Sequence, residues 1–130
     1  MLVVTITTLS LFAQPPRKMS YQAIIRDSGN QLVVNTEIGM QISILQGSAD
    51  GTAAYIETQI PTTNANGLVS IEIGGDDATA VSGNFASIDW SDGPWFIKTE
   101  TDPYGGTDYT ITGTNQLLTP GVWFTSFVNH

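Results

Sequence analysis

A chain of 130 residues, 41% of them hydrophobic, is long enough to form one domain with its own apolar core. Twelve acidic residues against four basic ones give a net charge of −8, which excludes the cationic face that nucleic acids and anionic membranes require. Cysteine is absent, so disulfides, thiolate catalysis and thiolate-bound metals are excluded as well. Only 12% of the residues are charged, about half the usual share, which favours an extracellular β-protein.

The start of the chain is apolar and uncharged. Residues 1–13 have the length of a signal-peptide core, are too short to span a bilayer comfortably as a helix, and end at Ala13, a suitable cleavage position. The sequence therefore predicts a signal peptide at residues 1–13, truncated at its start because no basic residue opens it, and a linker at residues 14–20. The alternative is a buried first strand. We expect an exported protein, secreted or on the outer cell surface, whose mature domain does not insert into a membrane.

Alternating apolar and polar side chains predict β-strands through the first half of the chain. These strands are expected over residues 21–26, 38–45, 53–62 and 68–73. In the second of them every other residue is Ile or Met, which indicates one face in a core. In the third, the predicted core face is Ala54, Ile56, Thr58 and Ile60, and the predicted solvent face is Tyr55, Glu57 and Gln59.

Residues 55–74 predict two strands joined by a tight turn at Asn66-Gly67. Both turn residues tolerate the positive φ that hairpin turns demand. On the second strand Val69, Ile71 and Ile73 alternate with polar residues and are expected to face the core. This hairpin indicates an all-β fold and carries no reactive constellation.

The second half of the chain is less regular. Residues 76–92 predict a long connection with one helical turn at residues 84–87, followed by strands at 95–101 and 109–118. The predicted fold is a single antiparallel β-sandwich of about seven strands, Ig-like or prealbumin-like, with Greek-key connections. Its predicted bounds are residues 21–118, with an atypical carboxyl-terminal tail at residues 119–130.

Catalytic chemistry finds little support in the residue pattern. The single histidine is His130, the last residue, where packing would not hold a catalytic imidazole. No spacing nominates a carboxylate pair for hydrolysis, so a hydrolase is the third alternative. We expect no catalytic residue and no cofactor.

Two binding sites remain as alternatives. Oxygen ligands on Gly-containing loops suit calcium, and the candidate ligands are Asp76, Asp77, Asp102 and Asp108. Neighbouring aromatic residues could form a sugar-stacking platform, and the candidates are Trp90, Trp95, Tyr104 and Tyr109. For the aromatic set we favour a simpler interpretation, in which Trp95 packs in the core and Trp90 closes the loop beneath it.

Most of the chain resembles a module of exported Bacteroidota surface proteins. The residues that carry the resemblance are MSYQAIIRDSGN (19–30), GMQISILQGSADGTAAYIETQIPTTNANGLVSIEIGG (39–75) and SGNFASIDWSDGPWFIKTETDPYGGTDYTITGTNQLL (82–118). In that family the module follows a signal peptide and often precedes collagen-like, coiled or tail-fibre-like regions, some with an intramolecular-chaperone terminus. The chain departs from the family after Leu118. There Trp123, Phe124 and Phe127 either belong to a last strand or result from a frame error that truncates a longer protein.

The resemblance implies a non-catalytic, secreted or cell-surface β-sandwich with a structural or adhesive role, and it supplies no catalytic residues. A protein or a glycan at the cell surface is the expected partner. The alternative function is a carbohydrate-binding module that uses the aromatic residues between Trp90 and Tyr109.

Overall fold

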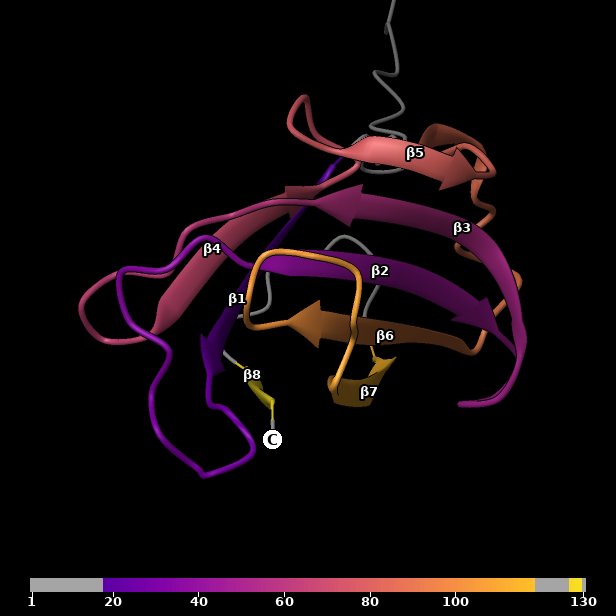
Figure 1. The fold of residues 1–130 in the computed structure, drawn as a ribbon. Helices are drawn as coiled ribbons and strands as arrows, with labels where there is room; N and C mark the ends of the chain where they lie inside the picture. Colours follow the sequence, from indigo (N-terminus) through magenta and orange to yellow (C-terminus); the bar gives the residue numbers. More distant parts are fainter. Residues whose placement is uncertain (1–17, 119–126, 130) are drawn as a thin grey trace, which may run out of the picture.

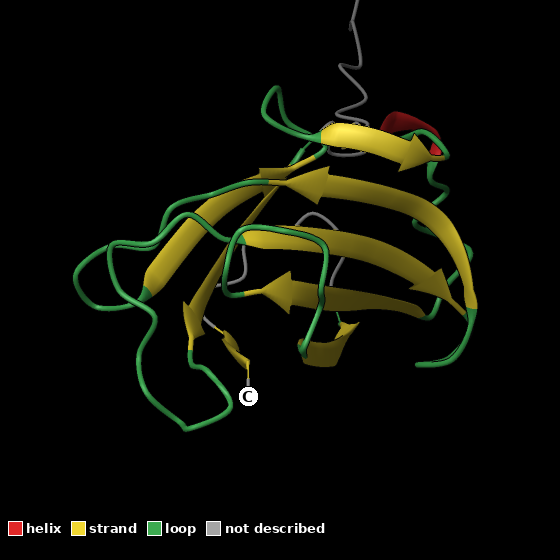
Figure 2. Cartoon of the chain, in the orientation of Figure 1, coloured by secondary structure: helices red, strands yellow, loops and turns green. Residues whose placement is uncertain are grey.

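The computed structural model describes residues 18–118 and 127–129, and in this part of the chain two β-sheets face each other across one core (Figures 1 and 2). The strands are β1 (Met19–Ile25), β2 (Gly39–Gln46), β3 (Thr52–Gln59), β4 (Leu68–Ile73), β5 (Thr79–Ser82), β6 (Trp95–Asp102), β7 (Ile111–Leu117) and β8 (Phe127–Asn129). One sheet has the order β5-β3-β2-β6-β7, and the other has the order β4-β1-β8. The predicted signal peptide, Trp123 and Phe124 lie outside the described residues.

The predicted all-β sandwich is confirmed. All pairings among strands β1 to β7 are antiparallel. The last strand, β8, pairs with β1 in parallel, with Phe127 opposite Ala23. β1 begins at Met19, inside the predicted linker, and β8 lies inside the predicted tail. The described residues contain no helix long and apolar enough to cross a membrane.

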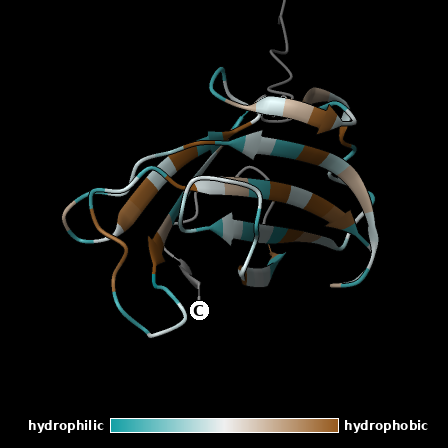
Figure 3. Ribbon diagram, viewed as in Figure 1, coloured by the Kyte–Doolittle hydropathy of each residue, from teal (hydrophilic) through white to brown (hydrophobic). Residues whose placement is uncertain are grey.

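The core is built from the inward face of each strand, and the alternation is visible as brown and pale bands along the strands (Figure 3). The predicted core faces of β2 and β4 are confirmed, because Ile42 and Ile71 are buried with their alternate neighbours, and Ile97 on β6 is buried in the same way. Burial of such side chains contributes about 1.5–3 kcal/mol each to folding. The fold is therefore stabilised by aliphatic contacts between the two sheets.

The predicted hairpin over residues 55–74 is wrong. β3 pairs with β2 and β5, whereas β4 pairs with β1 in the other sheet. The turn itself exists: Gly67 has φ +74°, and the Asn64 side chain accepts hydrogen bonds from the amides of Asn66 and Leu68. It orders the crossover between the sheets, because a local turn signal does not specify which strands pair across it.

The predicted faces of β3 are also wrong. Tyr55, Glu57 and Gln59 are buried, and Ile60 is exposed after the strand ends. The register explains the inversion, since Tyr55 and Glu57 lie opposite Ile44 and Ile42, which hold core positions on β2. Hydrogen bonds inside the fold satisfy the polar groups that this orientation buries.

The connection over residues 76–92 contains a strand that the sequence did not predict. β5 pairs with the edge of β3, and all four of its residues are exposed, so it has no alternation to detect. The predicted helical turn is confirmed as a 3₁₀ turn, Phe85–Ser87, capped by the Asn84 side chain. Phe85 from this turn packs into the core.

Candidate functional site

The aromatic residues proposed as a sugar platform do not share one exposed face. Trp95 is buried at the start of β6, and Trp90 packs against the core beside it, with ring centroids 5.5 Å apart and an interplanar angle of 62°. Phe85 continues this edge-to-face series to Tyr55. The two indoles therefore lie in the core arrangement that we favoured from the sequence.

The two tyrosines lie at the opposite end of β6. Tyr104 is 90% exposed in the turn after that strand, and Tyr109 is half-buried. Partial burial, followed by the charges of Glu100 and Asp102, raises the pKa of Tyr109. The length of β6 separates these rings from Trp90 and Trp95, so the four do not form one stacking surface.

Asp102 and Asp108 build a turn. The Asp102 carboxylate is buried and accepts hydrogen bonds from the amides of Tyr104 (2.9 Å) and Asp108 (3.0 Å). A carboxylate satisfied in this way stabilises the loop between β6 and β7. In the described part of the chain, no group of three or more acidic or histidine side chains is placed to hold a metal ion.

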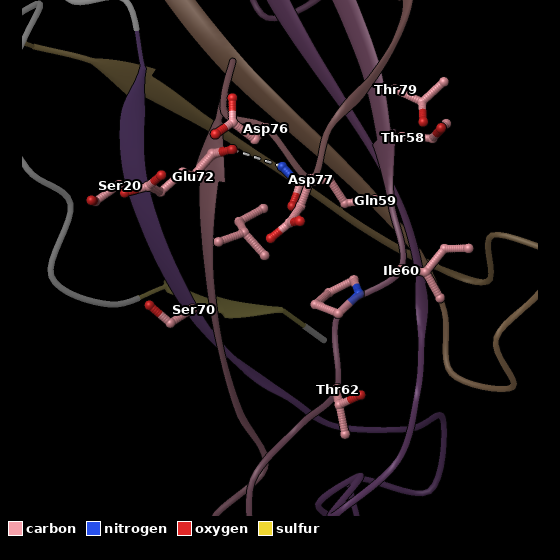
Figure 4. A pocket seen from close by; sticks show the side chains of 12 residues that line it. Ser20, Thr58, Gln59, Ile60, Thr62, Ser70, Glu72, Asp76, Asp77 and Thr79 are labelled. Carbon is pink, nitrogen blue, oxygen red and sulfur yellow. Dashed lines mark hydrogen bonds between the residues drawn. The ribbon is translucent and has the colours of Figure 1, made fainter.

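Asp76 and Asp77 lie elsewhere, on the wall of a groove between the two sheets. The groove has a volume of about 870 Å³ and opens where β4 of one sheet diverges from the end of β3 in the other (Figure 4). Its lining consists of Ser20, Thr58, Gln59, Ile60, Pro61, Thr62, Ser70, Ile71, Glu72, Asp76, Asp77 and Thr79. Hydroxyl groups and carboxylates dominate it, with an aliphatic floor and rim.

The groove is acidic. Glu72, Asp76 and Asp77 contribute three carboxylates at one end of it (Figure 4). One cation faces them among the described residues: Lys18 Nζ lies 3.2 Å from a Glu72 oxygen, and both side chains of that pair are more than half exposed. Three carboxylates against one ammonium group leave an excess of negative charge in the groove.

A buried polar cluster supports the groove from below. Glu57 is fully buried and accepts hydrogen bonds from the Tyr55 hydroxyl (3.0 Å), the Gly74 amide (2.6 Å) and the Gln59 amide group. Gln59 also donates to the Glu72 carbonyl oxygen at 2.9 Å. These bonds join β3 to β4 and thereby connect the two sheets where the groove opens.

The charge of Glu57 affects its neighbour. Burial, followed by the Glu57 charge and the hydrogen bond to it, raises the pKa of Tyr55 well above its ordinary value. The sequence reasoning missed this cluster because it placed Tyr55, Glu57 and Gln59 in solvent. The register with β2 shows which face of β3 is buried, and this register is visible in the fold but not in the sequence.

Comparison with known proteins gives a match to a family model. The family described as "Domain of unknown function (DUF8740)" matches residues 20–116, a range that contains strands β2 to β6 and nearly all of β1 and β7. No curated protein and no solved structure matches the chain. Because that match spans most of the sequence and nearly the whole sandwich, this chain is a member of the DUF8740 family.

Proposed function

We propose that this domain is a non-catalytic, exported β-sandwich module of the cell surface, with a structural or adhesive role. The resemblance of residues 19–118 to modules of exported Bacteroidota proteins supports export. The sparse charge of the chain supports it too, because the surface is covered mainly by neutral polar side chains. A protein ligand is the proposed partner.

The observation that carries the proposal is the groove between β4 and the end of β3. It combines a concave surface with strand edges that face away from their own sheets, and such edges bind other chains by main-chain hydrogen bonds. Hydroxyl and carboxylate side chains line it, which suits a polar partner.

The buried carboxylates also favour a scaffold over an enzyme. Glu57 and Asp102 each accept several hydrogen bonds from nearby backbone or side-chain donors, and these bonds fix loops and join the sheets. A general acid or base needs a proton acceptor or donor free for a substrate. Both groups act instead as structural centres.

Surface location is tested on intact cells of the organism that carries the gene. An epitope inserted in the exposed turn at residues 48–50, between β2 and β3, leaves the core untouched. We expect antibody to label the epitope, and added protease to remove it, without cell lysis. An epitope that becomes accessible only after lysis would contradict the proposal.

A further inference from the structure

We propose that the groove binds an extended, lysine- or arginine-containing peptide segment of a partner protein, which pairs as a strand with the edge of β4 at Ser70. This inference rests on the proposed role as a docking module and names the chemistry of its partner. It requires a strand edge that is open, a second wall that suits an extended chain, and a charge that selects basic side chains.

The open edge is centred on Ser70. In an antiparallel ladder, alternate residues direct both backbone groups toward the same neighbour. On β4 the backbone of Leu68 bonds to Asn64, and the carbonyl oxygen of Glu72 bonds to Gln59 and Gly75, so these even-numbered residues face away from β1. Ser70 lies between them with the same orientation, and its amide and carbonyl groups face the groove.

The second wall is the chain that follows β3. Pro61 accepts a hydrogen bond from Ile38, and Thr63 donates one to Thr36, so these odd-numbered residues face the β2 side. By the same alternation, Ile60 and Thr62 direct their backbone groups to the groove. β5 covers this edge only as far as the pairing of Thr58 with Thr79, which leaves the segment beyond it open.

An opening between two strand edges suits an extended peptide, which can form main-chain hydrogen bonds to both. A strand that enters the groove presents backbone groups to both sides and its side chains alternately inward and outward. Ile71 is buried in the floor, and Ile60 is 64% exposed on the rim, so aliphatic residues of the peptide find contact on both.

Charge selects the partner. Three carboxylates at one end of the groove face a single described cation, Lys18 on Glu72. Basic side chains on the peptide would complement Asp76 and Asp77, which are exposed and make no ion pair within the described residues. Exposed charge pairs act mainly on specificity and association rate, so the affinity should fall as salt rises.

The test uses three blocked peptides of equal length with the purified domain. The first alternates Lys with Val and Thr, the second has Glu in place of Lys, and the third has Pro in place of alternate residues and so lacks their amide donors. We expect the first to bind, with weaker affinity at high salt, the second not to bind, and the third to bind at least about tenfold more weakly than the first.

Two variants locate the site. Ser70→Pro removes the amide proposed to face the groove without removing a bond to β1, so we expect a loss of affinity of about tenfold, while Ser70→Thr keeps the affinity. The Asp76→Asn, Asp77→Asn double variant should bind the Lys peptide several-fold more weakly. Its matched control is Asp50→Asn with Asp108→Asn, which removes the same charge outside the groove and should leave the affinity unchanged.

Three results would overturn the inference: no binding of the Lys peptide at about 1 mM, equal binding of the Pro peptide, or equal loss in the two double variants. The double variants alter exposed residues, so they decide the question even if Ser70→Pro fails to fold. A domain that binds the peptide but is not exposed on cells contradicts only the proposed function. A surface-exposed domain that binds none of the peptides contradicts only this inference.

Discussion

Glu57 is a fully buried charged residue whose carboxylate is held by hydrogen bonds within the fold. Its two carboxylate oxygens accept hydrogen bonds from three donors, which offsets the cost of burying a charged group between the sheets. The three donors come from β3 and from the residue that follows β4. The stability of the groove region therefore requires that both carboxylate oxygens of Glu57 act as hydrogen-bond acceptors.

Glu57→Gln should destabilise the domain by about 1–3 kcal/mol, because the new amide group must face a donor. Gln59 cannot relieve the conflict by rotating its own amide, since it also donates to the Glu72 carbonyl oxygen. Urea unfolding measures the change as a shift in midpoint at constant slope. Glu72→Gln, at an exposed position, is the control and should stay within about 0.5 kcal/mol. A Glu57→Gln variant as stable as the wild type would refute the role of Glu57.

Tyr55 should make the domain sensitive to alkali. Its folded-state pKa is raised above the unfolded value of about 10, so the stability that it contributes is full below pH 10 and is lost as the pH rises beyond it. We expect the free energy of unfolding of Tyr55→Phe to fall less between about pH 9 and pH 11 than that of the wild type. A smaller slope should remain, because the pKa of Tyr109 is raised as well. Identical slopes in the two proteins would contradict the assignment.

At the scale of elements, the connection between β5 and β6 closes one end of the sandwich. Phe85 lies at its centre. The centroid of its ring is 5.5 Å from that of Tyr55 and 5.7 Å from that of Trp90, and both pairs have edge-to-face geometry. The regular backbone structure at this residue is a single 3₁₀ turn, Phe85–Ser87. The irregular segment is thus part of the core rather than a surface loop.

Phe85→Ala should cost about 3–5 kcal/mol, because it removes a buried ring and leaves a cavity between Tyr55 and Trp90. The change is measured by chemical unfolding, with near-ultraviolet circular dichroism to report the packing of the indoles. Val81→Ala, on the exposed strand β5 next to it in sequence, is the matched control and should change stability by less than about 0.5 kcal/mol. A loss below about 1 kcal/mol for Phe85→Ala would mean that this segment does not close the core.

The elements also show what the sequence could predict. β2 and β4 were predicted with their core faces because Ile or Met recurs at every other residue on β2, and Val69, Ile71 and Ile73 alternate with polar residues on β4. β3 carries small or aliphatic residues on one face and Tyr55 with two polar residues on the other, so alternation selected the wrong face. β5 has no buried side chain, and nothing in its pattern separates it from a loop.

The candidate site was less predictable than the strands. Asp76 and Asp77 were selected for their oxygen ligands, and they do lie together on the groove, but Asp102 and Asp108 organise a separate turn. The groove depends on β3 and β4 belonging to different sheets, and the hairpin prediction placed them in one. Long-range pairing decides such a site, and local sequence signals do not encode it.

At the scale of the whole molecule, the two sheets close on one core yet diverge where β4 leaves β3. There the Glu57 cluster and Gln59 hold the sheets together, and the acidic groove opens beside them (Figure 4). In our proposal the core and the edge of β4 have separate roles, since the core maintains the fold and the edge binds the partner. We therefore expect changes in the groove to affect binding more than stability.

The most direct measurement is amide hydrogen exchange, resolved by residue, in the free domain and with the Lys–Val–Thr peptide. In the free domain we expect the Ser70 amide to exchange much faster than those of Val69 and Ile71, which face β1. At saturating peptide, Ser70 should become protected while the Val69 and Ile71 amides change little. A Ser70 amide that is already as slow as its neighbours, or one that the bound peptide leaves unprotected, would contradict strand addition at β4.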